Sequence, residues 1–233
     1  MAERPVFTVL TTSPYYREEP ISFQYYSGFA ESQKKKSIVS LHSAFIQTNP
    51  QEKVLEISTK SDNQTGIMLS AFNLMIHTLD NRCYSVESAF QSSKVFENGG
   101  PYKDLLEKSP RDAKKDIRLK QSGKLKSFYF SKKTFPLEPK NYFYNWLYIN
   151  ALNLDKELSE KIMEYSAFTD IEFNPRKSIN CQACAAAIFV SLKKCGLLSE
   201  ALKSPQTFLN VVYKNEVLKN TGQVQLEILA ESI

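Results

Sequence analysis

Three polar residues in the middle of the chain have the types and the spacing that could do chemistry. Glu87, Gln91 and Lys94 stand at positions i, i+4 and i+7, so they fall on one stripe of a helix. A carboxylate and an amine held on one rigid face can act as acid, base or nucleophile. The same spacing is typical of the solvated face of an amphipathic helix, and periodicity alone favours that second interpretation.

A second polar cluster precedes the last strong helix pattern. It contains Asp170 and Glu172, followed by Lys177 and Asn180. Backbone N–H groups at a helix N-terminus, with cations close by, suit a phosphate group. The alternative is a polar loop that ends in an ordinary helix cap, and the residues alone favour that alternative.

A third polar stretch, residues 58–62, follows a predicted strand at 54–59. Lys60 is the only cation within it, and Ser70 and Phe72 come shortly afterwards. A lysine between a strand and a loop of small residues can become buried, which would make its amine reactive. An exposed lysine is the far more common outcome at such a position.

Lysine and arginine residues are dense between residues 111 and 126. The chain has 233 residues and a formal net charge of +5, which is mild for a soluble protein. Lys114, Lys115 and Arg118 are nevertheless close enough in sequence to contact neighbouring phosphates together. These three residues are therefore candidates to bind the backbone of a nucleic acid, although charge alone favours an ordinary basic surface.

Several common classes of protein are excluded by missing patterns. The sequence holds no Walker, Rossmann, HExxH or GxSxG motif, and we expect neither a cofactor nor a metal. Cys181 and Cys184 form a C-x-x-C within an alanine-rich run, which favours core thiols over a zinc or redox site. No apolar run is long enough to span a membrane, so we expect a cytoplasmic protein.

The elements that must position these residues are mostly helical. Helices are predicted at residues 37–46, 85–97, 110–119, 139–152, 155–165 and 178–195, with Ser85 and Ser109 as N-caps of the second and third. Strands are predicted at 21–26, 54–59 and 224–229, and a short one within 66–76. The pattern predicts a helix-rich α+β single domain over residues 51–233, with an N-terminal extension of residues 1–50 packed on it.

Three segments in this order resemble the NADAR family: LSAFNL at 69–74, YSVESAFQSSKVF at 84–96 and AFTDIEFNPRKSINCQA at 167–183. The middle one matches the family's E-x-x-x-Q-x-x-K helix, spacing included. It departs from the family where Ser85 and Val86 replace proline and threonine and where Ser88 replaces a histidine. A tryptophan–glycine signature is also missing before Asn180. These departures and the long N-terminal extension are similar to the branch of antitoxins paired with DarT-type toxins.

The resemblance implies a domain of the NADAR type and an activity that removes ADP-ribose from the guanine base of DNA. It implies Glu87 as the catalytic carboxylate and a lysine that attacks the sugar. Lys60 is the preferred lysine, and Lys94 is second because Glu87 on its own stripe should raise its pKa. The expected contacts to ADP-ribose are Ser70, Phe72, Gln91, Asp170, Glu172, Lys177 and Asn180.

The partners implied by the resemblance are ADP-ribosylated guanine in DNA and a cognate DarT-type toxin. Two other classes of function stay open at this point. One is a module that binds ADP-ribose or modified nucleic acid without turnover. The other is an antitoxin that neutralises its toxin by direct contact.

Overall fold

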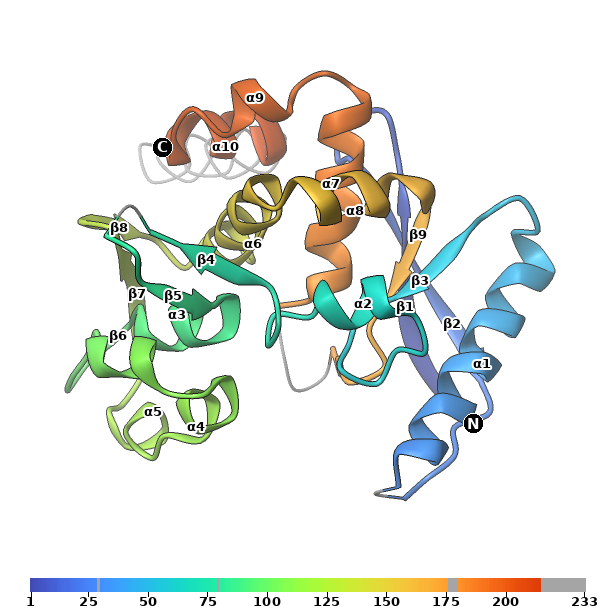
Figure 1. Cartoon of the computed structure of the whole chain (residues 1–233), viewed down its shortest axis with the longest axis horizontal. Coiled ribbons are helices and arrows are strands. Elements are labelled where there is room, and N and C mark those ends of the chain that lie inside the picture. Colours follow the sequence, from blue (N-terminus) through green and yellow to red (C-terminus); the bar gives the residue numbers. More distant parts are fainter. Residues whose placement is uncertain (29, 79, 176–179, 215–233) are drawn as a thin grey trace, which may run out of the picture.

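A four-stranded sheet forms one half of the molecule (Figure 1). The computed structural model describes residues 1–28, 30–78, 80–175 and 180–214. The strand order is β2 (Tyr16–Phe23), β1 (Ala2–Val9), β9 (Ala167–Thr169) and β3 (Val54–Glu56). β1 is antiparallel to both neighbours, whereas β3 runs parallel to β9. The first strand of the chain is therefore hydrogen-bonded to a strand from its last third.

One helix covers each face of this sheet. Helix α1 (Glu31–Thr48) packs Leu41 and Phe45 against Val6 of β1. The next residue of that strand, Phe7, belongs to the larger core that includes α8 (Gln182–Lys194). Because side chains alternate across a strand, neighbouring residues of β1 and β9 serve the two separate cores. The alanine-rich sequence of α8 lets this helix approach the sheet closely, and all of its residues from Ala183 to Leu192 are buried.

The other half of the molecule is built around a three-stranded sheet and an aromatic cluster. The strands are β6 (Lys94–Phe96), β7 (Leu125–Phe130) and β8 (Lys133–Phe135), all antiparallel. Phe143 on α6 (Tyr142–Leu154) stacks on Phe128 with ring centroids 4.8 Å apart, and Phe135 lies 4.7 Å from the same ring. Phe90 of α3 (Val86–Ser92) joins this cluster. The cluster holds α3 and α6 in fixed relative positions.

The remaining elements connect or cap these two halves. They are α2 (Gln64–Met68), β4 (Met75–His77), β5 (Cys83–Ser85), η1 (Lys103–Glu107), α4 (Pro110–Lys115), α5 (Arg118–Gln121), α7 (Lys156–Lys161), η2 (Ile162–Glu164), α9 (Leu198–Ala201) and α10 (Pro205–Val212). None of the described helices combines the length and the apolar character that a membrane span requires.

The predicted helix-rich α+β single domain is confirmed. Both predicted caps are present, since the side chains of Ser85 and Ser109 accept hydrogen bonds from backbone N–H groups in the first turn of α3 and α4. The predicted strand at 224–229 lies outside the described residues. The division of the chain at residue 50 stays a prediction, and β1 and β2 share a sheet with β3 and β9.

Predicted helices differ from the observed ones in extent: the helix predicted at 37–46 spans Glu31–Thr48, the one predicted at 155–165 divides into α7 and η2, and two further differences concern α3 and α4. The helix predicted at 85–97 ends at Ser92, because Lys94 to Phe96 pair with β7 instead. The helix predicted at 110–119 divides into α4 and α5, because Asp116 leaves helical geometry and its side chain accepts hydrogen bonds from the backbone and guanidinium of Arg118. In the first place a distant strand decides the backbone, and in the second a local side-chain contact does.

Candidate functional site

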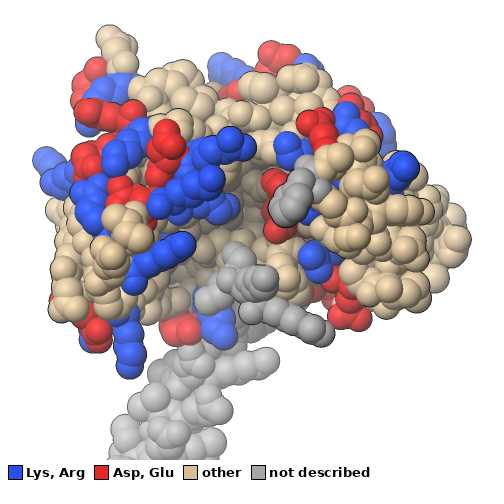
Figure 2. Space-filling model, turned by 90° about the horizontal axis from the view of Figure 1, so that it is seen from below, with Lys and Arg blue, Asp and Glu red and all other residues tan. Residues whose placement is uncertain are grey.

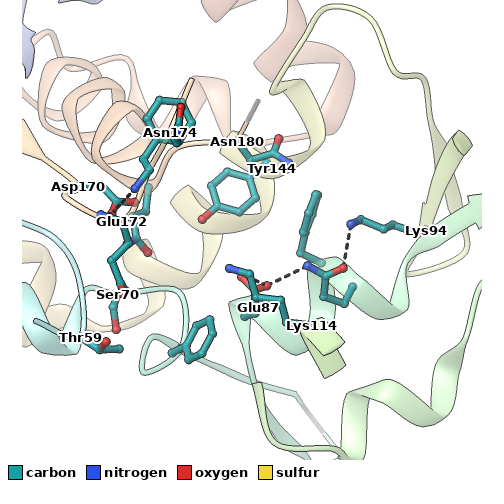
Figure 3. A pocket seen from close by; sticks show the side chains of 15 residues that line it. Thr59, Ser70, Glu87, Lys94, Lys114, Tyr144, Asp170, Glu172, Asn174 and Asn180 are labelled. Atoms are coloured by element: carbon teal, nitrogen blue, oxygen red, sulfur yellow. Dashed lines mark hydrogen bonds and ion pairs between the residues drawn. The ribbon is translucent and has the colours of Figure 1, made fainter. Parts of the chain in front are cut away.

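A polar cavity of about 460 Å³ opens between the two halves of the molecule. Figure 2 shows it as a hollow, and Figure 3 shows the side chains that line it. In Figure 3, Asp170, Glu172, Ser70 and Thr59 lie across from Glu87, Lys114 and Lys94. The lining residues are Thr59, Ser70, Phe72, Glu87, Phe90, Gln91, Lys94, Lys114, Tyr144, Asp170, Glu172, Phe173, Asn174, Asn180 and Gln182.

Helix α3 presents Glu87 to this cavity from a buried position. Backbone hydrogen bonds join the start of α3 to the preceding loop, from Glu87 N to Ala71 O at 2.9 Å and from Val86 N to Leu74 O at 2.9 Å. All seven residues of the helix are buried, and Glu87 is only 6% exposed. The interpretation of this stripe as a solvated face is therefore wrong. Burial of a carboxylate is costly unless it is hydrogen-bonded or paired, which makes this position unusual.

A chain of hydrogen bonds connects Glu87 to Lys94 through an amide. Gln91 Nε2 donates to Glu87 Oε1 at 2.8 Å, and Lys94 Nζ donates to Gln91 Oε1 at 2.8 Å. Lys114 Nζ lies 3.6 Å from Glu87 Oε1 and forms the nearest ion pair of this carboxylate. Because Gln91 stands between the two charged groups, Lys94 has no direct ion pair with Glu87 (Figure 3).

The surroundings of Lys94 lower the pKa of its amine. Nζ lies 4.8 Å from the centroid of the Phe90 ring. Burial is the main cause that lowers the pKa of Lys94, to about 8, and the positive charge of Lys114 acts in the same direction. Glu87 raises this pKa, as the sequence predicted, but the effect of burial is larger. At pH 8 about half of the Lys94 side chains are therefore neutral and nucleophilic.

Lys60, the lysine that the sequence favoured, is not among the residues that line the cavity. Its side chain is 32% exposed, and Nζ lies 3.9 Å from Glu31 Oε2 on α1. The preceding residue, Thr59, does reach the cavity. Thr59 and Lys60 lie in a turn after β3, closed by a hydrogen bond from Ser61 N to Ser58 O at 3.2 Å, and the side chain of Lys60 extends toward α1. The structure thus does not bring Lys60 to Glu87.

The opposite wall carries the acidic pair that the sequence singled out. Asp170 Oδ1 accepts hydrogen bonds from the backbone N–H groups of Glu172 at 3.0 Å and Phe173 at 3.1 Å. Burial raises the pKa of Asp170 well above its ordinary value, and the nearby carboxylate of Glu56 raises it further. Asp170 is therefore biased toward the protonated form, in which it can donate a proton.

The loop that carries Ser70 and Phe72 is joined to α8 by the side chain of Gln182. Its Oε1 accepts a hydrogen bond from Ala71 N at 2.8 Å, and its Nε2 donates to Ile57 O, after β3, at 2.7 Å. Ser70 and Phe72 line the cavity, and Lys114 Nζ lies 5.2 Å from the centroid of the Phe72 ring. Phe72 is partly exposed, so its face is available to a flat ligand.

Tyr144 is a lining residue that sequence reasoning missed. It is 5% exposed, and its pKa is raised well above the ordinary value by burial and by the charges of Glu87 and Asp170. The hydroxyl of Tyr144 thus lies within electrostatic reach of both carboxyl groups (Figure 3). Its position in an aromatic-rich helix indicates only a core residue, so no local signal marks it.

The predicted nucleic-acid contacts divide into three different environments. Lys114 lines the cavity and pairs with Glu87. Lys115 is exposed on α4. The guanidinium of Arg118 is occupied within the protein, because it donates to Asp104 Oδ2 at 2.6 Å and to Asp116 Oδ1 at 2.8 Å. Arg118 is therefore placed to hold α5 rather than to contact a phosphate.

Of the other predicted residues, Asn180 lines the cavity, and Lys177 lies outside the described residues. Within the described part of the chain, no group of three or more His, Cys, Asp or Glu residues could hold a metal ion. Cys181 and Cys184 are free thiols buried in the core, as predicted.

The fold and the cavity define a helix-rich α+β protein with buried carboxyl, amide and amine groups around one polar ligand site. A family model described as DarT1-associated NADAR antitoxin matches residues 2–222 of the chain. The chain therefore belongs to the family of DarT1-associated NADAR antitoxins, which confirms the resemblance seen in the sequence. A comparison with curated proteins found no match.

Proposed function

We propose that this antitoxin is a hydrolase that removes ADP-ribose from the guanine base of DNA. The resemblance to the NADAR branch paired with DNA-modifying DarT-type toxins supports the choice of substrate. The observation that supports an enzyme rather than a binding module is the buried chain Glu87–Gln91–Lys94. A buried carboxylate and an amine of lowered pKa on a cavity wall are typical of catalytic groups.

The bond to be broken joins the anomeric carbon of the distal ribose to the amino nitrogen of guanine. In a carboxylate route, Glu87 stabilises the positive charge that develops on the sugar ring as this bond breaks. The ammonium of Lys94, on the same side of the cavity as Glu87, gives its proton to the departing guanine nitrogen. Water then adds to the anomeric carbon and loses a proton to the amine of Lys94, which yields free ADP-ribose.

A lysine route uses the same groups in other roles. The neutral amine of Lys94 forms a bond to the anomeric carbon while the bond to guanine breaks, and the amine proton passes to the departing nitrogen. The ribose ring then opens to an imine on Lys94. Water adds to this imine, the ring closes, and ADP-ribose leaves while the lysine is regenerated. Lys94 is our choice over Lys60 because it lines the cavity and has a lowered pKa.

The remaining lining residues provide contacts for the rest of ADP-ribose. Ser70, Gln91, Glu172 and Asn180 offer polar atoms for hydroxyl and phosphate oxygens, and Phe72 offers a ring face for stacking. Lys177 keeps its proposed role at the diphosphate. Charged lysines and an acidic wall in one cavity suit a ligand that is both anionic and rich in hydroxyl groups.

The surface beside the cavity suits a DNA strand. Figure 2 shows Lys and Arg side chains gathered at one side of the hollow, over the half of the molecule that holds α4 and α5 in Figure 1. Lys115 is exposed there. Cations at this place can neutralise phosphates on either side of the modified nucleotide.

The direct test incubates the purified protein with guanine-ADP-ribosylated DNA and measures free ADP-ribose. We expect release at a rate that EDTA does not change, because both routes use side-chain groups alone. Absence of release from single-stranded and double-stranded substrate would contradict the proposal. An antitoxin that acts only by contact predicts that toxin neutralisation survives Glu87→Gln, whereas the proposed enzyme loses neutralisation with this change.

A further inference from the structure

A second cavity of about 230 Å³ adjoins the polar one. Phe90, Lys94, Tyr144 and Asn180 line both, so the two spaces meet beside the amine of Lys94. The volume of the second cavity is below the range of about 300–1,000 Å³ that holds a drug-sized ligand. It suits one flat group that extends from a larger ligand in the first cavity.

The walls of the second cavity are mainly aromatic and aliphatic. Phe128 and Phe143, which stack on each other, are part of the lining, and Leu125 and Leu137 contribute aliphatic surface. Such walls favour a nucleobase, because bases pack on aromatic rings. The lining also holds charged and amide groups that can contact the edge of a base, namely Lys94, Glu138, Lys140, Asn141 and Asn180.

One polar group in this lining has an unused acceptor. The side-chain oxygen of Asn141 is buried and has no hydrogen-bond partner among the described residues. Asn141 is the N-cap of α6, but its side chain makes no capping hydrogen bond, and its backbone has φ 66°. A buried acceptor without a partner destabilises the protein unless a ligand supplies the donor. The oxygen has almost no accessible surface in the free protein, so a bound base reaches it when the Asn141 side chain turns toward the cavity.

We propose that the second cavity is the guanine subsite of this antitoxin and that Asn141 recognises the Watson–Crick edge of the base. Guanine carries an N–H donor at N1 beside an acceptor at O6, and a side-chain amide matches this pair with its own acceptor and donor. Adenine offers the opposite pattern at these positions. The assignment rests on the proposed function, since it puts the scissile bond at the junction of the two cavities, beside Lys94.

A base can reach this subsite only when it is unpaired or turned out of the duplex, because the edge that Asn141 contacts is the one used in base pairing. Stacking inside the cavity then compensates for the lost stacking in DNA. The order of the two cavities follows from the ligand, with ADP-ribose in the polar cavity and guanine in the aromatic one.

Binding of unmodified oligonucleotides tests the subsite without any need for turnover. Short single strands of thymidine with one central guanine, hypoxanthine or adenine share the same phosphates. The intact protein should bind guanine and hypoxanthine alike, because both have N1–H and O6, and adenine about tenfold more weakly. Asn141→Gly accepts the left-handed backbone without strain and should abolish this difference. Asn141→Asp keeps an acceptor and should retain part of it.

A steric variant gives an independent readout. Leu137→Trp should fill the cavity and abolish the preference, whereas Leu154→Trp, on an exposed position of α6 outside both cavity linings, should leave it intact. Equal binding of all three strands, or a preference that survives Asn141→Gly, would overturn the guanine subsite. ADP-ribose release without any base preference would overturn the subsite alone. A base preference without ADP-ribose release would overturn the hydrolase alone.

Discussion

Two lysines stand beside short strands in this protein, and their surroundings differ in ways that sequence spacing does not reveal. Around Lys60, after β3, cations face exposed acids directly, as Lys35 Nζ does with Asp62 Oδ1 at 2.8 Å. Lys94, at the start of β6, is partly buried over Phe90 and reaches its acid only through Gln91. Direct exposed ion pairs stabilise an ammonium, whereas burial without a direct ion pair lowers the pKa of the amine. The chemistry therefore depends on what separates the charges.

The largest expected effect on turnover comes from replacing each of the two lysines in turn. In Lys94→Ala, turnover of ADP-ribosylated DNA should fall to background, while Lys60→Ala should retain the rate of the intact protein. Borohydride added during turnover should trap ADP-ribose covalently on the intact protein and on Lys60→Ala, but not on Lys94→Ala. Mass spectrometry of peptides locates the adduct.

An adduct on Lys60 would reverse this comparison. If no adduct forms on any lysine while turnover is normal, the imine is wrong and the carboxylate route with Glu87 and water stays. Binding of free ADP-ribose to Lys94→Ala separates loss of chemistry from loss of the fold.

The second prediction compares the carboxylates that neighbour the two lysines. Glu87→Gln keeps the shape of the side chain and removes its charge, so the rate should fall by about two orders of magnitude or more, since the positive charge that Glu87 stabilises develops on the sugar ring in either route. Glu31→Gln, beside Lys60, should change the rate little. The measurement is ADP-ribose release by variants whose circular dichroism matches that of the intact protein. A normal rate in well-folded Glu87→Gln would exclude Glu87 from the chemistry.

The third prediction concerns pH and tests the lysine route. Because the pKa of Lys94 is about 8, most of the amine is protonated at lower pH, and the rate should rise about tenfold per pH unit well below 8 and level off above it. Glu87 raises this pKa and Lys114 lowers it. The midpoint of the curve of rate against pH should therefore move to lower pH in Glu87→Gln and to higher pH in Lys114→Gln. Midpoints that do not move in these opposite directions would assign the titration to another group.

The sequence predicted the parts of this structure that depend on local chemistry. Ser85 and Ser109 are capping residues in the first turn of α3 and α4, and a side-chain oxygen at such a place accepts backbone N–H groups whatever the distant contacts are. The residues of the cavity were also found largely by motif, with Glu87 and Asp170 among them.

The errors lie where distant segments decide. Strand β6 exists because β7, some thirty residues later, pairs with it, and this pairing ends the helix before Lys94. Lys94 lines the cavity and Lys60 does not, and this difference follows from tertiary packing that spacing does not reveal. Tyr144 shows the same limit, because an aromatic residue that lines a cavity and one that fills a core have the same local pattern.

The smallest expected effect separates two neighbouring basic residues on α4 and α5. Lys115 is exposed, whereas the guanidinium of Arg118 is held by Asp104 and Asp116 and lies 4.4 Å from the centroid of the Tyr102 ring. A side chain that contacts a phosphate releases a counterion, so Lys115→Ala should reduce the slope of log affinity for DNA against log salt by about 0.7–0.9. Arg118→Ala should leave this slope unchanged and instead lower the midpoint of thermal unfolding, because Asp116 loses its main partner.

Turnover of a free ADP-ribosylated guanosine, which has no DNA backbone, should not change in Lys115→Ala. An equal loss on DNA and nucleoside would mean that Lys115 supports the cavity, and a reduced slope in Arg118→Ala would mean that its ion pairs open when DNA binds.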